Sequence, residues 1–473
     1  MSQALSQSLG GEWEGLCALY LPVTAEGSIW RYSRAPAPDD PEQGWKLHVS
    51  STILAANKVM AAVAPFLRDR GIMFKAPSTL RELDRINCGL FYGYGQVGKF
   101  ITVYPRSAAE AVDVARGLDR LTSGMRAPAV PFDLRYRPGS SVYYRYGAFK
   151  FAELENPDGT RTPALKDPDG NLVPDRREGA AAKPDWVADP LAAPPSEADD
   201  APLASPLQTT FRVFRALTQR GKGGVYKAVD MSTGAPRFCV VKEGRRDGEI
   251  QWDGRDGRWR VEHEQRVLHS LRAAGVDVPR VYSSFELEGN YYLVTEFVAG
   301  ATLQSLLDAR RRRLSLPLVA RYGVKLLALV ARIHAAGWVW RDCKPSNIVV
   351  TSAGELRPLD FEGACPVNRP DPVPWATPPF IPPESRTEGQ RSSGAGDDLY
   401  ALGAVIYLLL TGQLPTEAPP APVHRLRRNV PTPLGRLVSN LLDADPRRRP
   451  TAKDVSRALT ELATPAAERR RGA

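Results

Sequence analysis

Two carboxylates and an amide lie at fixed spacing in the C-terminal half of the chain. The run from Trp340 to Asn347 reads WRDCKPSN, and Asp360 follows thirteen residues after Asn347. Asp342 could accept the proton of a hydroxyl group, and Lys344 could neutralise charge on a group in transfer. Asn347 and Asp360 carry the oxygen ligands that Mg²⁺ prefers. These side chains predict phosphoryl transfer from a nucleoside triphosphate to an alcohol.

A second set of side chains, in the first 150 residues, is cationic. Apolar and polar residues alternate from Trp45 to Val49, so a strand would place Lys46 and His48 on one face. The set also contains Lys75, Lys99, Arg135 and Arg145. A neutral Lys can remove an α-proton while a His⁺ protonates a departing phosphate and nearby cations lower the pKa of the base. Each residue taken singly is more often a solvated strand residue, but together they predict a pocket for β-elimination of phosphate.

The elements that would position this cationic set alternate between strand and helix patterns. We expect strands at residues 45–50, 72–75, 98–105, 133–136 and 143–147. We expect helices at residues 53–70, 79–87 and 108–121. Residues 13–30 also alternate and are predicted to be a strand with a turn at Glu26-Gly27.

A glycine-rich run lies between two strand patterns further along the chain. Glycines let a backbone close over phosphates, so we predict that Gly221, Gly223 and Val225 contact a nucleotide. Lys242 ends a strand of buried type and needs a charged partner. Glu264, on a helix pattern at residues 261–271, is the first candidate, and Glu262 is the alternative.

A further strand pattern covers residues 291–298. The order and spacing of all these elements resemble the protein kinase family, and the resemblance implies that this strand runs into a hinge where backbone groups of Glu296 and Val298 meet the base of the nucleotide. The resemblance implies a Lys242–Glu264 pair, a carboxylate at Asp398 that braces the catalytic loop, and ion pairing of Glu384 with Arg449.

This sequence departs from the kinase pattern at several positions. Thr218 and Arg220 stand where glycines are expected in the glycine-rich run. Trp340 replaces the His that usually precedes Arg-Asp, and Glu362 replaces the Gly of Asp-Phe-Gly. The insertion at residues 244–258 is long for a kinase and is similar to that of lanthipeptide synthetases.

Four runs in the first region resemble the N-terminal lyase domain of class III/IV lanthipeptide synthetases, which is similar in turn to phosphothreonine lyases. They read Lys-x-His, Phe-Lys, Gly-Lys-Phe-x-Thr-x-Tyr-Pro and Tyr-Arg-Tyr-Gly. The resemblance implies that Lys75 is the general base and His48 the general acid, and that Lys46 stabilises the enolate or binds phosphate. Lys99, Arg135 and Arg145 would contact phosphate or peptide. An Arg that often precedes the Gly-Lys-Phe run in that family is missing from residues 92–97.

The resemblances imply an α+β fold with two folded regions. A phosphothreonine-lyase-like α+β domain is expected at residues 1–152, followed by a Pro/Ala-rich connector at 153–208. A bilobal protein-kinase-like domain would have its N-lobe at 209–298 and its C-lobe at 299–465, with a basic tail at 466–473. Within the connector, part of residues 165–191 is expected to pack on the lyase or its substrate, and residues 192–206 are expected to be an extended or disordered linker.

The resemblance also implies an activity and its partners. The kinase would phosphorylate Ser or Thr of a ribosomally made precursor peptide with a leader, using ATP or GTP with Mg²⁺. The lyase would then eliminate phosphate to leave dehydroalanine or dehydrobutyrine. Such synthetases usually continue into a cyclase domain, which these 473 residues do not include. Ring closure would then be spontaneous or need a separate cyclase, and a flavin-dependent cysteine decarboxylase is another candidate partner.

Composition limits the remaining possibilities. The net charge is +10, but much of it lies in short Arg runs without interleaved aromatic residues, so we expect no nucleic-acid partner. Five scattered cysteines form no disulfide or zinc pattern, and no apolar run reaches membrane-spanning length. A cytoplasmic enzyme is therefore expected. Two alternatives remain, namely a signalling Ser/Thr kinase with a non-catalytic sensor or docking region, and a binding scaffold with a degenerate kinase.

Overall fold

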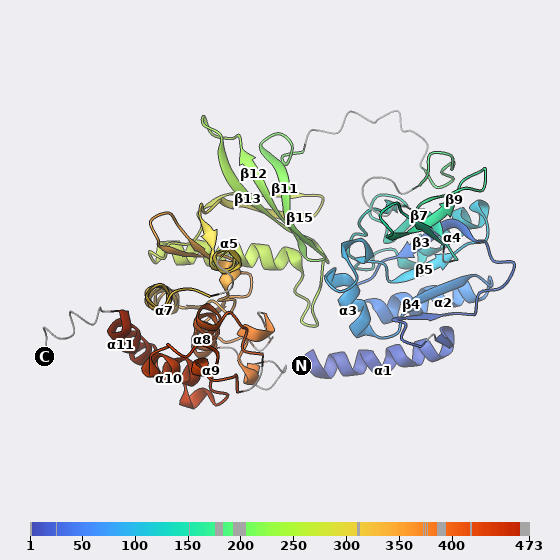
Figure 1. Cartoon of the computed structure of the whole chain (residues 1–473). Helices are drawn as coiled ribbons and strands as arrows, with labels where there is room; N and C mark the ends of the chain where they lie inside the picture. The colour runs from blue at the N-terminus through green and yellow to red at the C-terminus, as the bar shows by residue number, and fades with distance from the viewer. Residues whose placement is uncertain are drawn as a thin grey trace, which may run out of the picture. The chain divides into compact units, whose positions relative to one another are not determined.

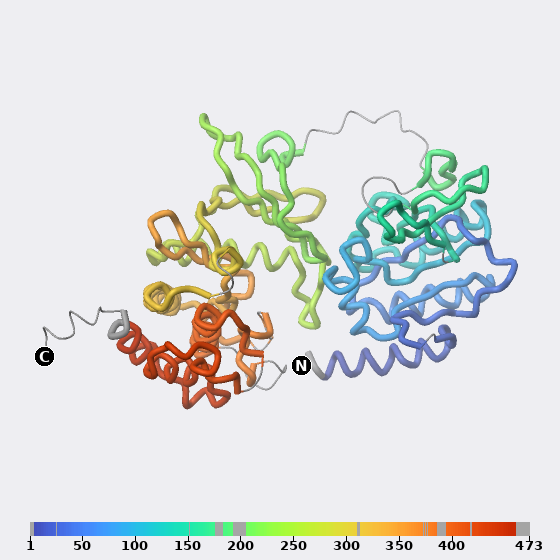
Figure 2. Tube along the Cα trace, in the orientation of Figure 1, coloured from blue at the N-terminus to red at the C-terminus, as the bar shows by residue number. Residues whose placement is uncertain are grey.

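The computed structural model describes residues 2–24, 26–150, 152–175, 183–192, 205–309, 313–371, 373, 375, 377–385, 394–416 and 419–463. They form two compact units (Figures 1 and 2). The first consists of Met1–Arg237, Val241–Trp259 and Phe285–Tyr292, and the second of Phe238–Val240, Arg260–Ser284 and Leu293–Ala473. Helices and strands are mixed in both, which confirms the predicted α+β class.

A seven-stranded sheet forms the centre of the N-terminal domain. Its strands are β1 (Val23–Thr24), β2 (Trp30–Tyr32), β3 (Gln43–Val49), β4 (Met73–Pro77), β5 (Ile101–Tyr104), β6 (Leu134–Arg135) and β7 (Val142–Ala148). They lie in the order β1-β2-β4-β5-β3-β7-β6, and every neighbouring pair is antiparallel. The order brings together strands that are far apart in the sequence.

Helices cover one face of this sheet. They are α1 (Ser2–Tyr20), α2 (Ala56–Arg68), α3 (Leu80–Cys88) and α4 (Ala108–Thr122), and Figure 1 shows α2 and α4 beside the strands. Leu47 and Val49 of β3 lie in one hydrophobic core with Val63 of α2 and Val114 of α4. Period-two alternation on β3 therefore leaves Lys46 and His48 on the opposite face, as predicted.

The prediction of a strand across residues 13–30 is wrong for most of that range. Residues up to Tyr20 belong to the helix α1, and only the short strands β1 and β2 follow. Trp13, Cys17 and Leu21 are the fully buried residues of this segment. Their spacing of four is helical, but the further apolar residues Leu16, Leu19 and Tyr20 lie between them and concealed it.

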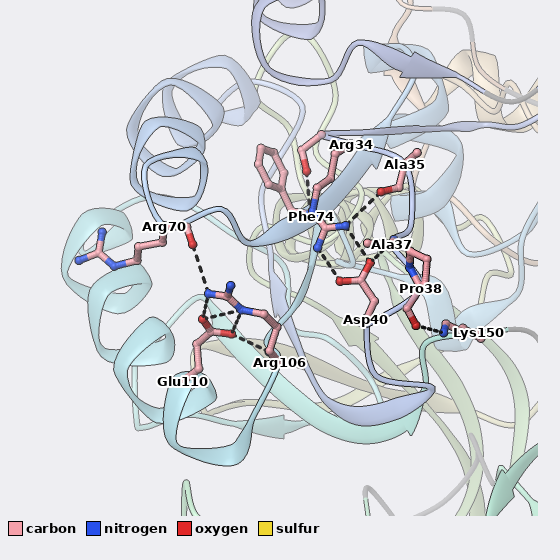
Figure 3. A network of polar contacts seen from close by, with 11 residues as sticks. Arg34, Ala35, Ala37, Pro38, Asp40, Arg70, Phe74, Arg106, Glu110 and Lys150 are labelled. Carbon is pink, nitrogen blue, oxygen red and sulfur yellow. Dashed lines mark hydrogen bonds and ion pairs between the residues drawn. The ribbon is translucent and has the colours of Figure 1, made fainter.

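Ion pairs hold the loop that leads into β3. Figure 3 shows Arg34 donating to both carboxylate oxygens of Asp40, at 2.7 and 2.6 Å. The hydrogen bond from Arg34 lowers the pKa of Asp40 to about 2. In the same view Arg106 pairs with Glu110 at the start of α4 and reaches the carbonyl oxygen of Arg70 at 3.3 Å. The first pair fixes the loop internally, and the contacts of Arg106 join the segment after α2 to the start of α4.

The first part of the expected connector is folded. Strands β8 (Glu153–Glu155), β9 (Arg161–Lys166) and β10 (Leu172–Pro174) form a three-stranded sheet. Further along, Asp189 accepts a hydrogen bond from the Tyr144 hydroxyl at 3.0 Å, and Leu191 lies in the core of the N-terminal domain. This part of the connector therefore packs on the domain before it, as expected for residues 165–191. Most of residues 192–206 fall outside the described residues.

The four strands expected for the kinase N-lobe, together with β14, which was not predicted, form a five-stranded sheet in the order β11-β12-β13-β15-β14. Their bounds are β11 (Phe211–Arg220), β12 (Gly223–Asp230), β13 (Arg237–Gly244), β14 (Val281–Leu287) and β15 (Asn290–Glu296). Helix α5 (Gly257–Ala273) follows β13 after the predicted insertion.

Helices dominate the rest of the second unit. They are α6 (Leu303–Ala309), α7 (Leu316–Ala335), α8 (Ala395–Thr411), α9 (Val423–Leu426), α10 (Thr432–Leu441) and α11 (Ala452–Ala463). Small sheets are formed by β16 (Ala301–Thr302), β18 (Ile348–Val350) and β19 (Leu356–Pro358), and by β17 (Trp338–Val339) with β20 (Cys365–Pro366). Arg449 makes a bidentate pair with Glu384 at 2.7 and 2.8 Å, as predicted.

Two further properties concern the whole described chain. All five cysteines are free thiols. Among the helices that the structure describes, none has both the length and the apolar character needed to cross a membrane.

Candidate active sites

The cationic residues of the N-terminal domain meet in rows across its sheet. Lys75 on β4 pairs in register with Thr102 on β5, and Thr102 pairs with His48 on β3. In the next row Lys46 on β3 is opposite Arg145 on β7. Neighbouring antiparallel strands place such partners about 5 Å apart on one face. Residues separated by up to about 100 positions in the chain therefore share one surface.

This surface contains a cavity of about 330 Å³, here called the cationic pocket. Five of the six predicted residues line it, together with six further residues: Lys46, His48, Lys75, Lys99 and Arg145, and Ile29, Trp30, Tyr92, Gln96, Thr102 and Tyr104. Arg135 does not line the cavity. Its guanidinium group instead donates to the Tyr143 hydroxyl at 2.9 Å from the Nε atom.

An acidic residue that the sequence reasoning missed holds the histidine of the pocket. His48 Nδ1 lies 2.5 Å from Asp133 Oδ2, and Lys99 Nζ lies 3.1 Å from Asp133 Oδ1. The side chain of Asp133 is 1% exposed. A carboxylate on Nδ1 fixes the ring orientation and directs Nε2 away from itself, which suits an acid that must deliver a proton elsewhere. Asp133 is therefore a positioning residue for His48.

Burial and charge act in opposite directions on this pair. Burial lowers the pKa of His48 to about 4, although Asp133 acts to raise it. Burial acts to raise the pKa of Asp133, but His48 and Lys99 outweigh it and lower that pKa to about 2. In the free protein at neutral pH, His48 is therefore neutral. A phosphate dianion in the pocket would raise its pKa and charge the ring.

We expect anion binding in the cationic pocket to take up a proton at His48. Sulfate is a suitable probe because it does not titrate near neutral pH. Calorimetry in two buffers of different ionisation enthalpy should show uptake of up to about one proton per sulfate, with affinity that weakens as the pH rises from about 5 to 8. The His48→Gln protein should bind sulfate without this uptake. Equal proton uptake in both proteins would show that another group titrates.

Aromatic rings border the lysine that would act as the base. Lys75 Nζ lies 4.3 Å from the centre of the Trp30 ring and 5.8 Å from that of Tyr32. Lys46 Nζ lies 5.8 Å from the centre of the Tyr104 ring. Rings at these distances limit the directions in which an ammonium group can lie. Both lysines are thus directed by aromatic side chains on the pocket face.

Arg145 is held by the connector. Its Nη2 atom donates to Asp175 Oδ1 at 2.5 Å, and the two side chains are 6% and 1% exposed. Asp175 directly follows β10. A buried Arg needs such a partner, because an uncompensated charge inside a protein is costly. The connector therefore contributes to the pocket by orienting a cation that lines it.

The catalytic-loop residues of the second unit also come together. Asn347 Nδ2 donates to Asp342 Oδ2 at 2.8 Å, and Lys344 Nζ donates to the same oxygen at 2.9 Å. Lys344 Nζ also donates to the Thr377 hydroxyl at 3.2 Å. Burial raises the pKa of Asp342. The positive charge of Lys344 acts to lower this pKa, and the negative charge of Asp360 acts to raise it further. A carboxylate with a raised pKa is a better proton acceptor than an ordinary one.

Asp398 of α8 braces this loop through hydrogen bonds to its backbone, as predicted. Its carboxylate accepts from the backbone N–H groups of Trp340 at 2.8 Å and Arg341 at 2.7 Å, and lies 2.8 Å from His334 Nε2. Trp340 donates from Nε1 to the carbonyl oxygen of Asp360 at 3.0 Å. The Trp that replaces the usual His therefore still supplies a ring N–H donor, and its role is structural.

The two residues predicted to hold Mg²⁺, Asn347 and Asp360, offer the oxygen atoms that this ion prefers, and their role as its ligands remains a prediction. Asn347 Nδ2 donates to Asp342, so only its Oδ1, which also accepts from the Ser346 hydroxyl at 3.5 Å, can serve as a metal ligand. Asp360 has a left-handed backbone, with φ of 65°. Carboxylate oxygens of Asp360, Glu362 and Glu264 lie within 4.8 Å of one another. An all-oxygen set of this kind suits a hard divalent cation.

The residues predicted to contact the nucleotide differ in their burial and in their backbone hydrogen bonds. The N–H of Glu296 donates to the Arg280 carbonyl at 2.8 Å, so its own carbonyl is the group left for a base. The N–H of Gly221 donates to the Cys88 carbonyl at 3.0 Å, and Val298 is buried. Gly223 has φ of 147°, which favours glycine. For Gly221, Gly223, Val225, Glu296 and Val298, nucleotide binding remains a prediction.

The pairing of Lys242 with Glu264 also remains a prediction. Lys242 lies on β13 and Glu264 on α5. Glu264 Oε1 accepts a hydrogen bond from the N–H of Phe361 at 3.2 Å, which ties α5 to the Asp360 segment.

Two family models match the chain. One, described as the RamC N-terminal domain, matches residues 23–202, and the other, described as the protein kinase domain, matches residues 211–458. The first match includes most residues of the expected connector, in agreement with its packing on the N-terminal domain.

Several curated relatives match parts of the chain. A probable SapB synthase of Streptomyces coelicolor is 33% identical over 408 residues, which is 82% of this chain and 42% of that protein. The serine/threonine-protein kinase PknA of Nostoc is 28% identical over 270 residues, 54% of this chain and 47% of that protein. Human citron Rho-interacting kinase is 30% identical over 162 residues, 33% of this chain and 8% of that protein. The chain thus spans less than half the length of these relatives.

Proposed function

The chain belongs to the protein kinase family and carries a RamC N-terminal domain in front of the kinase domain, and from this premise we propose that it dehydrates Ser and Thr in two steps. The kinase phosphorylates the side-chain hydroxyl of a peptide. The lyase then eliminates that phosphate and leaves dehydroalanine or dehydrobutyrine. The substrate is a ribosomally made precursor peptide with a leader, as in lanthipeptide biosynthesis.

The first step uses the catalytic loop. ATP or GTP with Mg²⁺ supplies the γ-phosphoryl group when bound. Asp342 accepts the proton of the Ser or Thr hydroxyl as its oxygen attacks. Lys344, which lies 2.9 Å from Asp342, neutralises negative charge on the group in transfer. Asn347 and Asp360 would hold the metal through their side-chain oxygens.

The second step uses the cationic pocket. Lys75, in its neutral form, removes the α-proton of the phosphorylated residue. The electron pair forms the Cα=Cβ double bond, and the Cβ–O bond breaks. His48 delivers a proton to the departing phosphate, whose charge is balanced by Lys99 and Arg145. Lys46 stabilises the enolate or binds the phosphate, and both roles suit its place on the pocket face.

The observation that carries the proposal is the cationic pocket itself. Three lysines, a histidine and an arginine line one cavity, and Asp133 orients the histidine. A domain that only recognised a signal or docked a substrate would not need a buried, oriented His–Asp pair. Nor would it need, in the same cavity, a lysine such as Lys75 that aromatic rings hold in place. Phosphate is a far better leaving group than hydroxide, so a kinase is the fitting companion of such a pocket.

The proposal is tested with the full chain, Mg²⁺, ATP or GTP, and a Ser/Thr-containing precursor peptide. Mass spectrometry should show net loss of water, with phosphopeptide only as a transient species. Phosphopeptide that persists would refute the proposed lyase step and favour a signalling kinase with a docking domain. A peptide that does not change with either nucleotide would count against the kinase step as well.

Several properties follow only from the resemblance and remain predictions. These are the leader peptide, ring closure that is spontaneous or needs a separate cyclase, and a cysteine decarboxylase partner. A cytoplasmic location is expected from composition and also remains a prediction. The choice between ATP and GTP is decided by the same assay with each nucleotide.

A further inference from the structure

The kinase insertion makes unusual contacts inside the first unit. This insertion, defined as Arg245–Asp256, connects β13 to α5 and lies in the same compact unit as the whole N-terminal domain. The glycine-rich turn, defined as Gly221–Gly224, belongs to that unit too. Insertions on a protein surface are usually polar and mobile. This one has an irregular backbone and a buried apolar residue, Ile250, although Asp253 in its turn is exposed.

An apolar segment of the insertion packs into the core of the N-terminal domain. Ile250 is 3% exposed and belongs to the same hydrophobic core as the strands and helices of that domain, and Trp252 packs against it. Asp247 and Glu249 both have left-handed backbones, with φ of 59° and 46°. Such conformations are unfavourable for residues other than glycine and persist only where surrounding contacts enforce them. Specific contacts with the N-terminal domain therefore hold the insertion in this conformation.

Charged contacts fasten the insertion at its base. Arg126 follows α4 of the N-terminal domain, and its Nε atom lies 2.5 Å from Asp247 Oδ1. Arg126 Nη2 lies 3.5 Å from Asp256 Oδ2. The Asp247 and Asp256 side chains are 7% and 9% exposed. The guanidinium group of Arg245 stacks 5.0 Å from the centre of the Tyr94 ring. Two nearly buried carboxylates thus share one arginine of the N-terminal domain.

The insertion in turn holds the glycine-rich turn. The N–H of Arg245 donates to the Lys222 carbonyl at 2.8 Å, and Arg245 Nη1 donates to the Arg220 carbonyl at 3.1 Å. A Cβ atom on Gly257 would lie 1.8 Å from the Lys222 carbonyl oxygen, and one on Gly248 would lie 2.4 Å from that of Gly221. Only glycine permits backbones to approach this closely.

The N-terminal domain also holds the turn directly. The N–H of Gly221 donates to the Cys88 carbonyl at 3.0 Å, and a Cβ atom on Gly221 would lie 1.6 Å from the Asn87 carbonyl oxygen. Asn87 is itself fixed, because its side chain donates to the Ser51 carbonyl and accepts from the N–H of Gly98. The turn is therefore held between the end of α3 and the insertion.

We infer that the N-terminal domain sets the conformation of the glycine-rich turn, and that Arg126, Asp247 and Asp256 are positioning residues for nucleotide binding. A turn that is held in place does not have to be ordered by the nucleotide, which improves affinity. The inference rests on the proposed kinase step but not on the lyase step. The insertion thereby helps phosphoryl transfer by holding the glycine-rich turn in place for the nucleotide.

The test measures the dissociation constant of a fluorescent ATP analogue with Mg²⁺, using the full chain. Arg126→Asp and Asp247→Arg should each raise it by about 3- to 30-fold. The double variant Arg126→Asp/Asp247→Arg, which restores an opposite-charge pair, should recover most of the loss. Elimination from a synthetic phosphothreonine peptide without nucleotide should stay near the original rate in all three proteins.

Unchanged nucleotide affinity in the single variants would overturn the inference, and so would failure of the double variant to recover it. If a charge-reversed protein also lost elimination, Arg126→Gln would decide the matter. Its dissociation constant should rise by a smaller factor with elimination intact, and an unchanged constant would overturn the inference. An original protein that binds the analogue and phosphorylates peptide but never dehydrates it would instead refute the proposed lyase step alone.

Discussion

The Lys75→Ala protein is expected to stop the reaction at the phosphopeptide. Removing a general base slows proton abstraction by about 10²- to 10⁴-fold. The catalytic loop is untouched, so phosphorylation continues and phosphorylated peptide accumulates in place of the dehydrated product. Time-resolved mass spectrometry of the peptide, with ATP and Mg²⁺ in excess, follows both species.

The matched control for this variant is Lys58→Ala, because Lys58 is an exposed lysine on α2. That protein should dehydrate peptide at the original rate. A Lys75→Ala protein that still dehydrates peptide at the control rate would refute the assignment of Lys75 as base. Retained near-ultraviolet circular dichroism would show that the pocket variant is folded.

The Asp342→Asn protein is expected to leave the peptide unmodified. The amide keeps the shape of the carboxylate but cannot accept the hydroxyl proton, and phosphoryl transfer should fall by about 10²- to 10⁴-fold. No phosphopeptide is then made for the lyase. The same protein should still eliminate phosphate from a synthetic phosphothreonine peptide, because the cationic pocket is intact.

Asp308→Asn serves as its control, since Asp308 is an exposed carboxylate on α6. Phosphorylation by Asp342→Asn at the control rate would show that proton removal by this residue is not needed. Loss of elimination in Asp342→Asn would show that the two activities are not separable in the way proposed.

Local patterns predicted most elements of the N-terminal domain. The helices α2 and α4 were found because apolar residues recur at helical spacing over three or more turns. Ser107 caps α4 by accepting from the N–H of Glu110, and Gly71 ends the helical run before β4, so start and stop signals agreed with the periodicity. The first helix was missed because Trp13, Cys17 and Leu21 mark only one narrow stripe.

The catalytic loop could be predicted in detail because its residues are close in sequence. Asp342, Lys344 and Asn347 lie within six positions, and the loop is short enough for spacing alone to define the contacts. The role of Trp340 required the structure, because its ring N–H bonds to a carbonyl twenty residues away.

The pocket could be predicted only in part. Alternation on β3 placed Lys46 and His48 together, but the strand order that brings Lys75 and Arg145 beside them depends on pairings between distant segments. Asp133 and Asp175 come from a loop and from the connector, and no periodic pattern marks either of them. Arg135 was predicted as a phosphate contact, yet its bond to Tyr143 keeps it out of the cavity lining.

The attachment of the insertion was likewise beyond sequence reasoning. Its length was noticeable, but Ile250 and Trp252 give no local sign of where they pack. Gly221 fits a phosphate-binding turn by its residue type, but in the structure a Cβ atom added to it would meet the Asn87 carbonyl oxygen. A glycine in the sequence indicates that some group comes close to the backbone, but it does not show whether that group is a phosphate or another part of the chain.

The central claim is that the hydroxyl oxygen of Ser or Thr leaves as part of phosphate. A peptide whose Ser hydroxyl carries ¹⁸O tests this directly, with the original protein, unlabelled ATP and Mg²⁺. Mass spectrometry of the released inorganic phosphate should find one ¹⁸O atom for each double bond formed, because the Cβ–O bond breaks and the P–O bond to that oxygen is kept. Dehydrated peptide together with unlabelled phosphate would contradict the account.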